Sequence, residues 1–153
     1  MRFTDDSLTL SAYRLIKNII RGIPLIFKSQ LSDVALPSED LATVVLSRAI
    51  ELSSKAALID GTTGSTLTFG ELAKKVNHMA AGLAQRGFKK GDVFAIFCPN
   101  TPEYAIAFLA VAKIGGINTT VNSLYSTEDL IHQFNDSGAK FLLTVPQFLD
   151  RAR

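Results

Sequence analysis

Apolar and polar positions along residues 87–121 predict a strand, a helix and a second strand. The apolar run Val93–Cys98 is short and lies between Gly-Asp and Pro-Asn, which is typical of a strand buried on both faces. The longer run from Tyr104 to Ile114 carries no charge between Glu103 and Lys113, so a helix here must be covered on most sides. A strand, a helix and a strand in this order form a βαβ unit, which requires a parallel sheet.

Residues at both ends of this central helix have capping chemistry. Asn100 or Thr101 can serve as the N-cap, and Pro102 fits the first helical position, where no backbone N–H is needed. Gly115 can take the left-handed conformation that often ends a helix. The Pro-Asn-Thr-Pro corner thus lies at the carboxyl end of a strand, where α/β proteins tend to bind ligands. It offers no charged partner or nucleophile, so its expected role is architectural.

The same periodicities predict elements before this unit. A helix beginning near Pro37–Glu39 should end near Ser53–Ser54, and a hairpin should pair Ala56–Ile59 with Leu67–Phe69. Thr68–Glu71 matches a capping box, which opens a helix that ends at Gly87. The apolar stripe of the first helix is Leu41, Val44, Val45, Ala49 and Leu52, and that of the second is Leu72, Val76, Met79, Ala80 and Leu83.

Further elements follow the central unit. Ser126–Asp129 repeats the capping pattern, and the helix after it should turn Leu130, Ile131 and Phe134 inward until Gly138. Lys140–Val145 predicts a buried strand, and Pro146 opens a last helix. Strands that alternate with helices predict an α/β fold, part of a doubly wound, mostly parallel sheet with flanking helices.

The basic excess of the chain lies in residues 1–32. They hold five Lys/Arg against two Asp, whereas the remainder holds eleven Lys/Arg against twelve acidic residues. Between residues 8 and 23 the apolar positions follow a helical period with basic residues opposite. This favours a helix packed on the domain or on a further part of the protein, or a peripheral membrane or organelle-targeting helix. We therefore predict an amphipathic basic leader over residues 1–32 and a domain over residues 33–153.

The overall composition is that of a folded intracellular protein. Hydrophobic residues make up 47% of the chain, and a net charge of +2 gives no reason to expect a nucleic-acid partner. The single cysteine, Cys98, fits a reducing compartment and is interpreted as a small buried hydrophobe. Arg14, Lys17 and Arg21 interrupt any secretory signal, and no apolar run reaches the roughly 18 residues of a membrane span. Cytoplasm, peroxisome and mitochondrion all stay open.

Motif analysis predicts no catalytic, cofactor-binding or metal-binding residue. Asp60–Ser65 is rich in Gly and Thr, but it lacks the Lys of a Walker loop and lies between two short strands, so we interpret it as a hairpin turn. His78 and His132 are interpreted as solvated or partly packed side chains rather than metal ligands. Asp92 is interpreted as a turn residue and Lys89–Lys90 as a solvated turn.

Several segments taken together resemble the AMP-forming acyl-CoA synthetases, in the branch of the adenylate-forming enzymes that contains 4-coumarate–CoA ligase and beetle luciferase. The resemblance covers about residues 26–150 in unbroken order, which makes the set specific although each motif alone is weak. The matching segments are Ile26–Ser29, Asp33–Pro37, Asp60–Phe69, Glu71–Leu72, Gly87–Val93, Cys98–Glu103, Ala110–Gly116, Val121–Asn122, Leu124–Leu130 and Ala139–Thr144.

The resemblance implies the first portion of the large N-terminal domain of an adenylate-forming enzyme. The parent would activate a fatty or aromatic acid with ATP and Mg²⁺, release pyrophosphate, and then transfer the acyl group from AMP to coenzyme A. The family's phosphate loop, its Tyr-Gly-x-Thr-Glu motif, its ribose-binding Asp and its C-terminal Lys have no counterpart in residues 1–153. The chain itself is therefore expected to bind none of these cofactors, to be inactive, and to be marginally stable or to aggregate alone.

The sequence is also compatible with two other functions. The chain could be an independent nucleotide-binding α/β domain, or a non-catalytic product that acts by association, for instance through membrane contact of residues 8–23. A downstream sequence that continues past Arg153 into Ser-Gly-Thr-Thr-Gly-x-Pro-Lys would favour the ligase over both. A reporter fused to residues 1–32 that stays diffuse in the cytosol would exclude the membrane and targeting roles of the leader.

Overall fold

The structure is a computed structural model that describes Ile16 and residues 29–153. Contacts divide the chain into two units, residues 1–36 and residues 37–153. In the first unit, residues 29–36 form no helix or strand. The predicted leader helix of residues 8–23 lies outside the described residues except for Ile16, so the division into leader and domain stays a prediction. No helix in the described part of the chain is long and apolar enough to cross a membrane.

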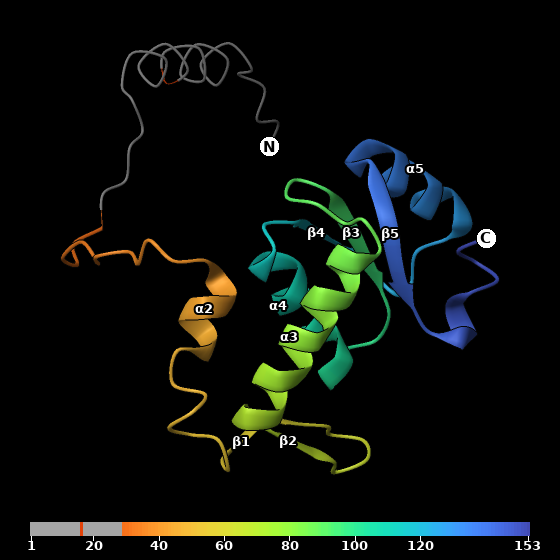
Figure 1. Cartoon of the computed structure of the whole chain (residues 1–153). Coiled ribbons are helices and arrows are strands. Elements are labelled where there is room, and N and C mark those ends of the chain that lie inside the picture. The colour runs from red at the N-terminus through yellow and green to blue at the C-terminus, as the bar shows by residue number, and fades with distance from the viewer. Residues whose placement is uncertain (1–15, 17–28) are drawn as a thin grey trace, which may run out of the picture. The chain divides into compact units, whose positions relative to one another are not determined.

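The second unit has an antiparallel hairpin and a three-stranded parallel sheet with helices (Figure 1). The strands of the sheet lie in the order β4-β3-β5, and both neighbouring pairs are parallel. This confirms the predicted α/β fold with a parallel sheet and flanking helices. The elements are α2 (Leu41–Leu46), β1 (Ala56–Ile59), β2 (Thr66–Thr68), α3 (Phe69–Gln85), β3 (Val93–Phe97), α4 (Pro102–Lys113), β4 (Ile117–Thr120), α5 (Thr127–Ser137), β5 (Ala139–Thr144) and the 3₁₀ turn η1 (Pro146–Phe148).

The central βαβ unit has the bounds that its caps predict. Thr101 is the N-cap of α4 and Pro102 its first residue, while Gly115 has a φ of 72° just past the helix end. Within α4 only Glu103 and Lys113 are exposed, which confirms that the helix is covered on most sides. The Thr101 side chain makes no capping hydrogen bond, so the helix start is recognised from Pro102 and the helix end from Gly115.

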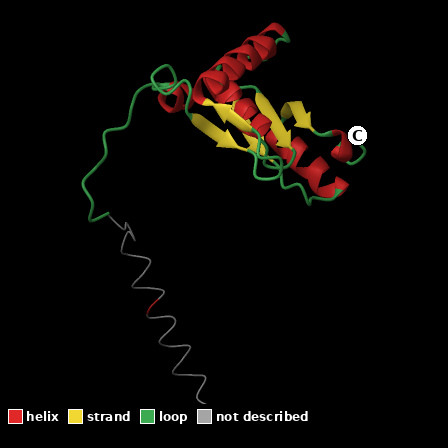
Figure 2. Ribbon diagram, turned by 90° about the horizontal axis from the view of Figure 1, so that it is seen from below, coloured by secondary structure: helices red, strands yellow, loops and turns green. Residues whose placement is uncertain are grey.

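Side chains of β3 alternate between two apolar layers. Phe94 and Ile96 pack with residues of α3 and α4, including Val111, on one face of the sheet. Phe97 points to the other face and packs against Leu130 of α5. Helices therefore cover both faces of the sheet, as the doubly wound prediction requires (Figure 2).

Two capping boxes begin α3 and α5. The backbone N–H of Glu71 donates to the Thr68 hydroxyl, and the Glu71 carboxylate accepts the Thr68 N–H at 2.9 Å. Ser126 and Asp129 make the same reciprocal bonds at the start of α5. Both predicted boxes are confirmed, and each satisfies N–H groups that a helix start would otherwise leave without a partner.

The first predicted helix is wrong in length. α2 begins after Asp40, whose carboxylate caps Thr43, and it ends at Leu46, after which residues 47–54 form successive turns. Ala42 is the only buried residue of α2, whereas Leu41 and Val45 are 51% and 45% exposed. Leu41, Val44 and Val45 are largely uncovered, so a longer helix would gain little free energy from burying them, and valines have low helix propensity.

Several boundaries and burial predictions near the C-terminus are also wrong. Ile131 is 56% exposed, because α5 meets the sheet through Leu130 and Phe134 instead. The strand predicted at residues 140–145 runs over Ala139–Thr144 and is only half-buried, because it lies at the edge of the sheet. The last helix is a single 3₁₀ turn, whose N-cap Val145 makes no side-chain capping bond.

The second hairpin strand lies one residue earlier than predicted, since Phe69 is already helical.

An ion pair joins the start of β3 to the start of β5. The Asp92 carboxylate accepts the Lys89 backbone N–H at 2.8 Å and a bond from Lys140 Nζ at 2.6 Å. Lys140, followed by the bond from Lys89, holds the pKa of the Asp92 carboxyl below its usual value. Asp92 is therefore a turn residue, as predicted, and it also ties together two strands that are distant in sequence.

Asp92→Asn is expected to lower the thermal midpoint at neutral pH, because the neutral amide loses both charge-assisted bonds. The folded-state pKa lies below the unfolded value of about 3.9, so the stabilisation is present above that pH and lost as pH falls through the folded pKa. Thermal melts of both proteins should differ at neutral pH and converge in acid. Asp150→Asn, at an exposed position, is the control and should change little. A difference between wild type and Asp92→Asn that persists in strong acid would contradict this account.

Candidate functional site

The carboxyl ends of β3 and β4 form a topological switch point. The chain leaves β3 through α4 on one face of the sheet and leaves adjacent β4 through α5 on the other face. Because the two connections diverge, the loops between these strand ends leave a crevice, which is the usual ligand position in open α/β sheets. The predicted Pro-Asn-Thr-Pro corner forms one side of it.

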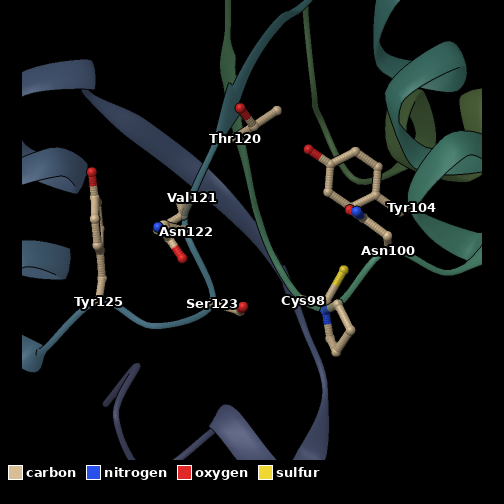
Figure 3. Close-up of a pocket in the computed structure, with 9 residues that line it drawn as sticks. Cys98, Asn100, Tyr104, Thr120, Val121, Asn122, Ser123 and Tyr125 are labelled. Atoms are coloured by element: carbon tan, nitrogen blue, oxygen red, sulfur yellow. The ribbon is translucent and has the colours of Figure 1, made fainter.

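The crevice has a volume of about 550 Å³ and is built from three short segments (Figure 3). In the figure, Tyr104 from the first turn of α4 and Tyr125 stand on opposite sides of it. The lining residues are Cys98, Pro99 and Asn100 after β3, Tyr104, and Thr120, Val121, Asn122, Ser123 and Tyr125 at the end of β4 and beyond. The lining contains no Asp, Glu, Lys, Arg or His, so the crevice is a neutral polar site.

Cys98 is poorly suited to act as a nucleophile in this crevice. The side chain is 6% exposed, and burial, with a smaller contribution from the Glu103 charge, raises the pKa of its thiol. The thiol therefore stays protonated near neutral pH. The prediction that Cys98 is a buried hydrophobe is confirmed, although the residue also lines the crevice.

Arg151 holds the loop that forms one wall of the crevice. Its Nη1 donates to the carbonyl oxygens of Ser123 at 3.0 Å and Tyr125 at 3.1 Å. The guanidinium lies over the Phe148 ring, 4.5 Å from its centroid, and also over the ring of Phe97 at 5.2 Å. The wall is thus braced from the α5 side of the sheet. Sequence reasoning missed Arg151, since these contacts join segments 26 and 28 residues apart.

Charged groups lie at the amino ends of the strands, the end of the sheet opposite the crevice. Lys89, Lys90 and Asp92 precede β3, and Lys140 lies at the start of β5, so all four belong to the amino ends of the strands. In a parallel sheet all amino ends of the strands lie at one end and all carboxyl ends at the other. These lysines are therefore not positioned to neutralise an anion in the crevice, which can hold a ligand through neutral hydrogen bonds and ring contacts.

The other residues with candidate chemistry are dispersed. Asp60–Ser65 is a hairpin turn, as predicted, in which the Asp60 carboxylate accepts the N–H groups of Thr62 and Thr63. These bonds lower the pKa of Asp60. His78 on α3 and His132 on α5 are exposed. Over the residues that the structure describes, no cluster of His, Cys, Asp and Glu could hold a metal ion.

Comparisons with known proteins agree on one family. The sequence model of a family described as AMP-binding enzyme matches residues 47–153. The chain is 35% identical over 131 residues to 4-coumarate–CoA ligase 3 of Arabidopsis thaliana, across 85% of this chain and 23% of that protein. It is 37% identical over 125 residues to 4-coumarate–CoA ligase 5 of Oryza sativa subsp. japonica, across 81% of this chain and 23% of that protein.

A solved structure has the same fold. The N-terminal domain of FACL13 from Mycobacterium tuberculosis superimposes with a TM-score of 0.70 at 22% identity, over 73% of this chain and 28% of that one. Against the curated relatives, the chain spans about a quarter of their length, 23% in both cases given above.

Proposed function

This chain belongs to the AMP-binding enzyme family, and we propose that it forms the first part of an enzyme that joins a carboxylic acid to coenzyme A. The observation that carries the proposal is identity of 35% to a 4-coumarate–CoA ligase across 85% of the chain. The parent enzyme would use ATP to convert the acid to an acyl-adenylate and pyrophosphate. The thiol of coenzyme A would then attack the acyl carbon and displace AMP.

We propose an aromatic or fatty acid as the substrate class of the parent. The relatives named above are 4-coumarate–CoA ligases, which supports an aromatic acid as the first compound to test. Adenylation is needed because a carboxylate is a poor electrophile until one of its oxygens becomes part of a good leaving group.

The role proposed for residues 37–153 is structural support of the activating domain. The buried layers on both faces of β3 fix the crevice walls, and Arg151 braces the loop of Ser123 and Tyr125. In this role the crevice would hold an uncharged polar portion of a substrate between the two tyrosine rings. The described residues do not provide an acidic cluster for Mg²⁺, so we assign them no step that uses the metal.

A segment exchange tests the proposal. Residues 47–153 would replace the matching segment of 4-coumarate–CoA ligase 3, and the chimera would be assayed for 4-coumarate-dependent exchange of labelled pyrophosphate into ATP. We expect exchange to be retained, because the segment supplies the same scaffold. The control is the same chimera with Gly116→Ala, which disturbs the packing of the scaffold and should therefore unfold at a lower temperature than the unsubstituted chimera. A folded chimera without any exchange would count against the proposed function.

The switch-point crevice also favours a second candidate, an independent nucleotide-binding domain. Titration calorimetry of ATP and AMP into the 153-residue chain separates the two candidates. Tight, saturable binding by this chain alone would support the independent domain. The ligase proposal expects weak binding or none, because the crevice lining has no basic side chain.

A further inference from the structure

The turns that lead into β3, β4 and β5 form a basic surface at the end of the sheet opposite the crevice. All the Lys and Arg residues of these turns are exposed, and an exposed isoleucine lies among them. We call this surface the amino-end face, and its side chains are Arg86, Lys89, Lys90, Lys113, Ile117 and Lys140. Each turn joins consecutive elements between α3 and β5, so the face is built entirely from chain that the structure describes.

The three turns are in direct contact with one another. The side chain of Lys90 lies against Gly115, where its Cγ is 2.9 Å from the position of an added Cβ. The Asp92 carbonyl oxygen accepts the Ile117 N–H at 2.9 Å, and the Asp92 carboxylate accepts a bond from Lys140 Nζ at 2.6 Å. Basic side chains from turns that are distant in sequence therefore share one continuous surface.

The amino-end face is positive, whereas the crevice end of the sheet is not. Residues 86–92, 113–117 and 136–140, all of which the structure describes, contain five Lys/Arg against Asp92 and Asp136, a net charge of +3. The first turns of α4 and α5, at the crevice end, carry the acidic residues Glu103, Glu128 and Asp129, which Arg151 offsets in part. The two ends of one sheet thus differ in the sign of their charge.

The arrangement of these bases fits an extended anionic surface better than a single small anion. A phosphate site needs donors that converge on one point, whereas these side chains are exposed and belong to three turns. Helix dipoles favour a base at Lys113, the last residue of α4, but Lys89 and Lys90 lie outside the helices. Helix stabilisation therefore does not explain the whole cluster.

The uncharged side chains of these turns favour a lipid surface over nucleic acid. Ile117 is 53% exposed at the start of β4, so an alkyl side chain lies among the bases. The headgroup region of a membrane accepts such a side chain and attracts lysine and arginine without fixed geometry. Proteins that bind single-stranded nucleic acid use exposed aromatic rings for base stacking, and Phe88, the aromatic residue of the turn between α3 and β3, is 4% exposed.

We propose that the amino-end face docks on the surface of an anionic lipid membrane. In this orientation the amino ends of the strands face the headgroups, and the crevice at the carboxyl ends opens toward water. Repulsion between the lipid charge and the acidic first turns of α4 and α5 favours the same orientation. The proposal concerns residues of the second unit alone, and it is independent of the ligase function proposed above.

Co-sedimentation with vesicles tests the docking of the full 153-residue chain. The wild-type chain should bind vesicles that contain phosphatidylserine, bind pure phosphatidylcholine vesicles weakly, and dissociate as the salt concentration rises. Lys89→Gln with Lys90→Gln should lower the partition coefficient on phosphatidylserine vesicles at least tenfold, because each charge near an anionic leaflet contributes about fivefold. A wild-type chain that does not bind phosphatidylserine vesicles overturns the proposal.

Lys74→Gln with Lys75→Gln is the matched control. It removes the same charge from exposed positions of α3, roughly three turns before that helix ends, and it leaves residues 1–32 unchanged. Binding of this variant should stay within about twofold of wild type, because charges farther from the lipid surface than a Debye length are screened. Equal losses for the two double variants would mean that binding follows net charge alone, and they would overturn the proposal.

The chimera described above separates the amino-end face from the basic leader, because it contains residues 47–153 of this chain and not residues 1–32. Lys89→Gln with Lys90→Gln should lower vesicle binding of the chimera at least tenfold as well. Binding that this change leaves unaltered overturns the proposal, since the face would then be covered or unused in a complete ligase. Displacement from the vesicles by inorganic phosphate at constant ionic strength would identify a small-anion site and overturn the choice of lipid. Vesicle binding is measured without pyrophosphate exchange, so failure of this proposal can be told from failure of the ligase proposal.

Discussion

Phe97→Ala is expected to lower the free energy of unfolding of the second unit by about 3–5 kcal/mol, the usual cost of removing a buried phenylalanine. Phe97 has no exposed surface and lies on the central strand, where it packs with Val121 and Leu130. Its ring centroid is also 5.0 Å from that of Phe148. The alanine would leave a cavity on the α5 side of the sheet, because backbone strands on both sides of β3 prevent collapse.

The same substitution should loosen one wall of the crevice. The Arg151 guanidinium lies over the Phe97 and Phe148 rings while it holds the carbonyls of Ser123 and Tyr125. Urea unfolding followed by circular dichroism gives the stability change, and Ile131→Ala, at a position 56% exposed on α5, is the control. The control should change stability by less than about 0.5 kcal/mol. Similar losses for the two variants would contradict the packing described here.

Gly116→Ala is expected to destabilise the domain by about 1–3 kcal/mol through overpacking. A Cβ at Gly116 would lie 2.7 Å from Phe88 Cζ and 2.8 Å from Val111 Cγ1, with Phe88 Cε1 closer still. Phe88 is 4% exposed and makes edge-to-face contacts with Phe94 and Phe141, so its ring has little room to move. The close approach of β4 to α4 thus depends on the missing side chain.

Gly61→Ala is the matched control for this prediction. No atom lies within 4 Å of a Cβ added at Gly61, and its backbone is outside the left-handed region. The Gly61 variant should unfold at the wild-type urea midpoint or slightly above it, because alanine lowers the entropy of the unfolded chain. If Gly116→Ala were equally harmless, the contact between Gly116 and Phe88 would be wrong.

Helices whose ends carry capping residues, proline or glycine could be predicted from the sequence. The start of α4 is recognised from Pro102 and its end from Gly115, and the two capping boxes locate the starts of α3 and α5. These signals work because cap residues act on the backbone within a few positions of themselves. The order of strands and helices then limits the fold to a parallel sheet, which the structure confirms.

Features that depend on tertiary neighbours could not be predicted in the same way. α2 is short because only Ala42 is buried, and Ile131 is exposed because the sheet meets α5 one residue earlier in the turn. β5 could not be recognised as an edge strand, since its apolar sequence resembles that of a central one.

The crevice also depends on contacts that are distant in sequence. It exists because β4 lies beside β3 while β5 lies on the other side, an order that no local pattern specifies. The prediction that the Pro-Asn-Thr-Pro corner is only architectural did not anticipate that Asn100 would share a crevice with Asn122 and two tyrosines.

The central proposal is that this chain supports the acid-activating domain of a longer enzyme without containing its catalytic residues. The most direct test is acid-dependent exchange of labelled pyrophosphate into ATP by the purified, folded 153-residue chain, measured beside a complete 4-coumarate–CoA ligase. We predict exchange by the complete enzyme and none by this chain with 4-coumarate or with a fatty acid. Exchange by this chain that requires both ATP and the acid would contradict the proposal.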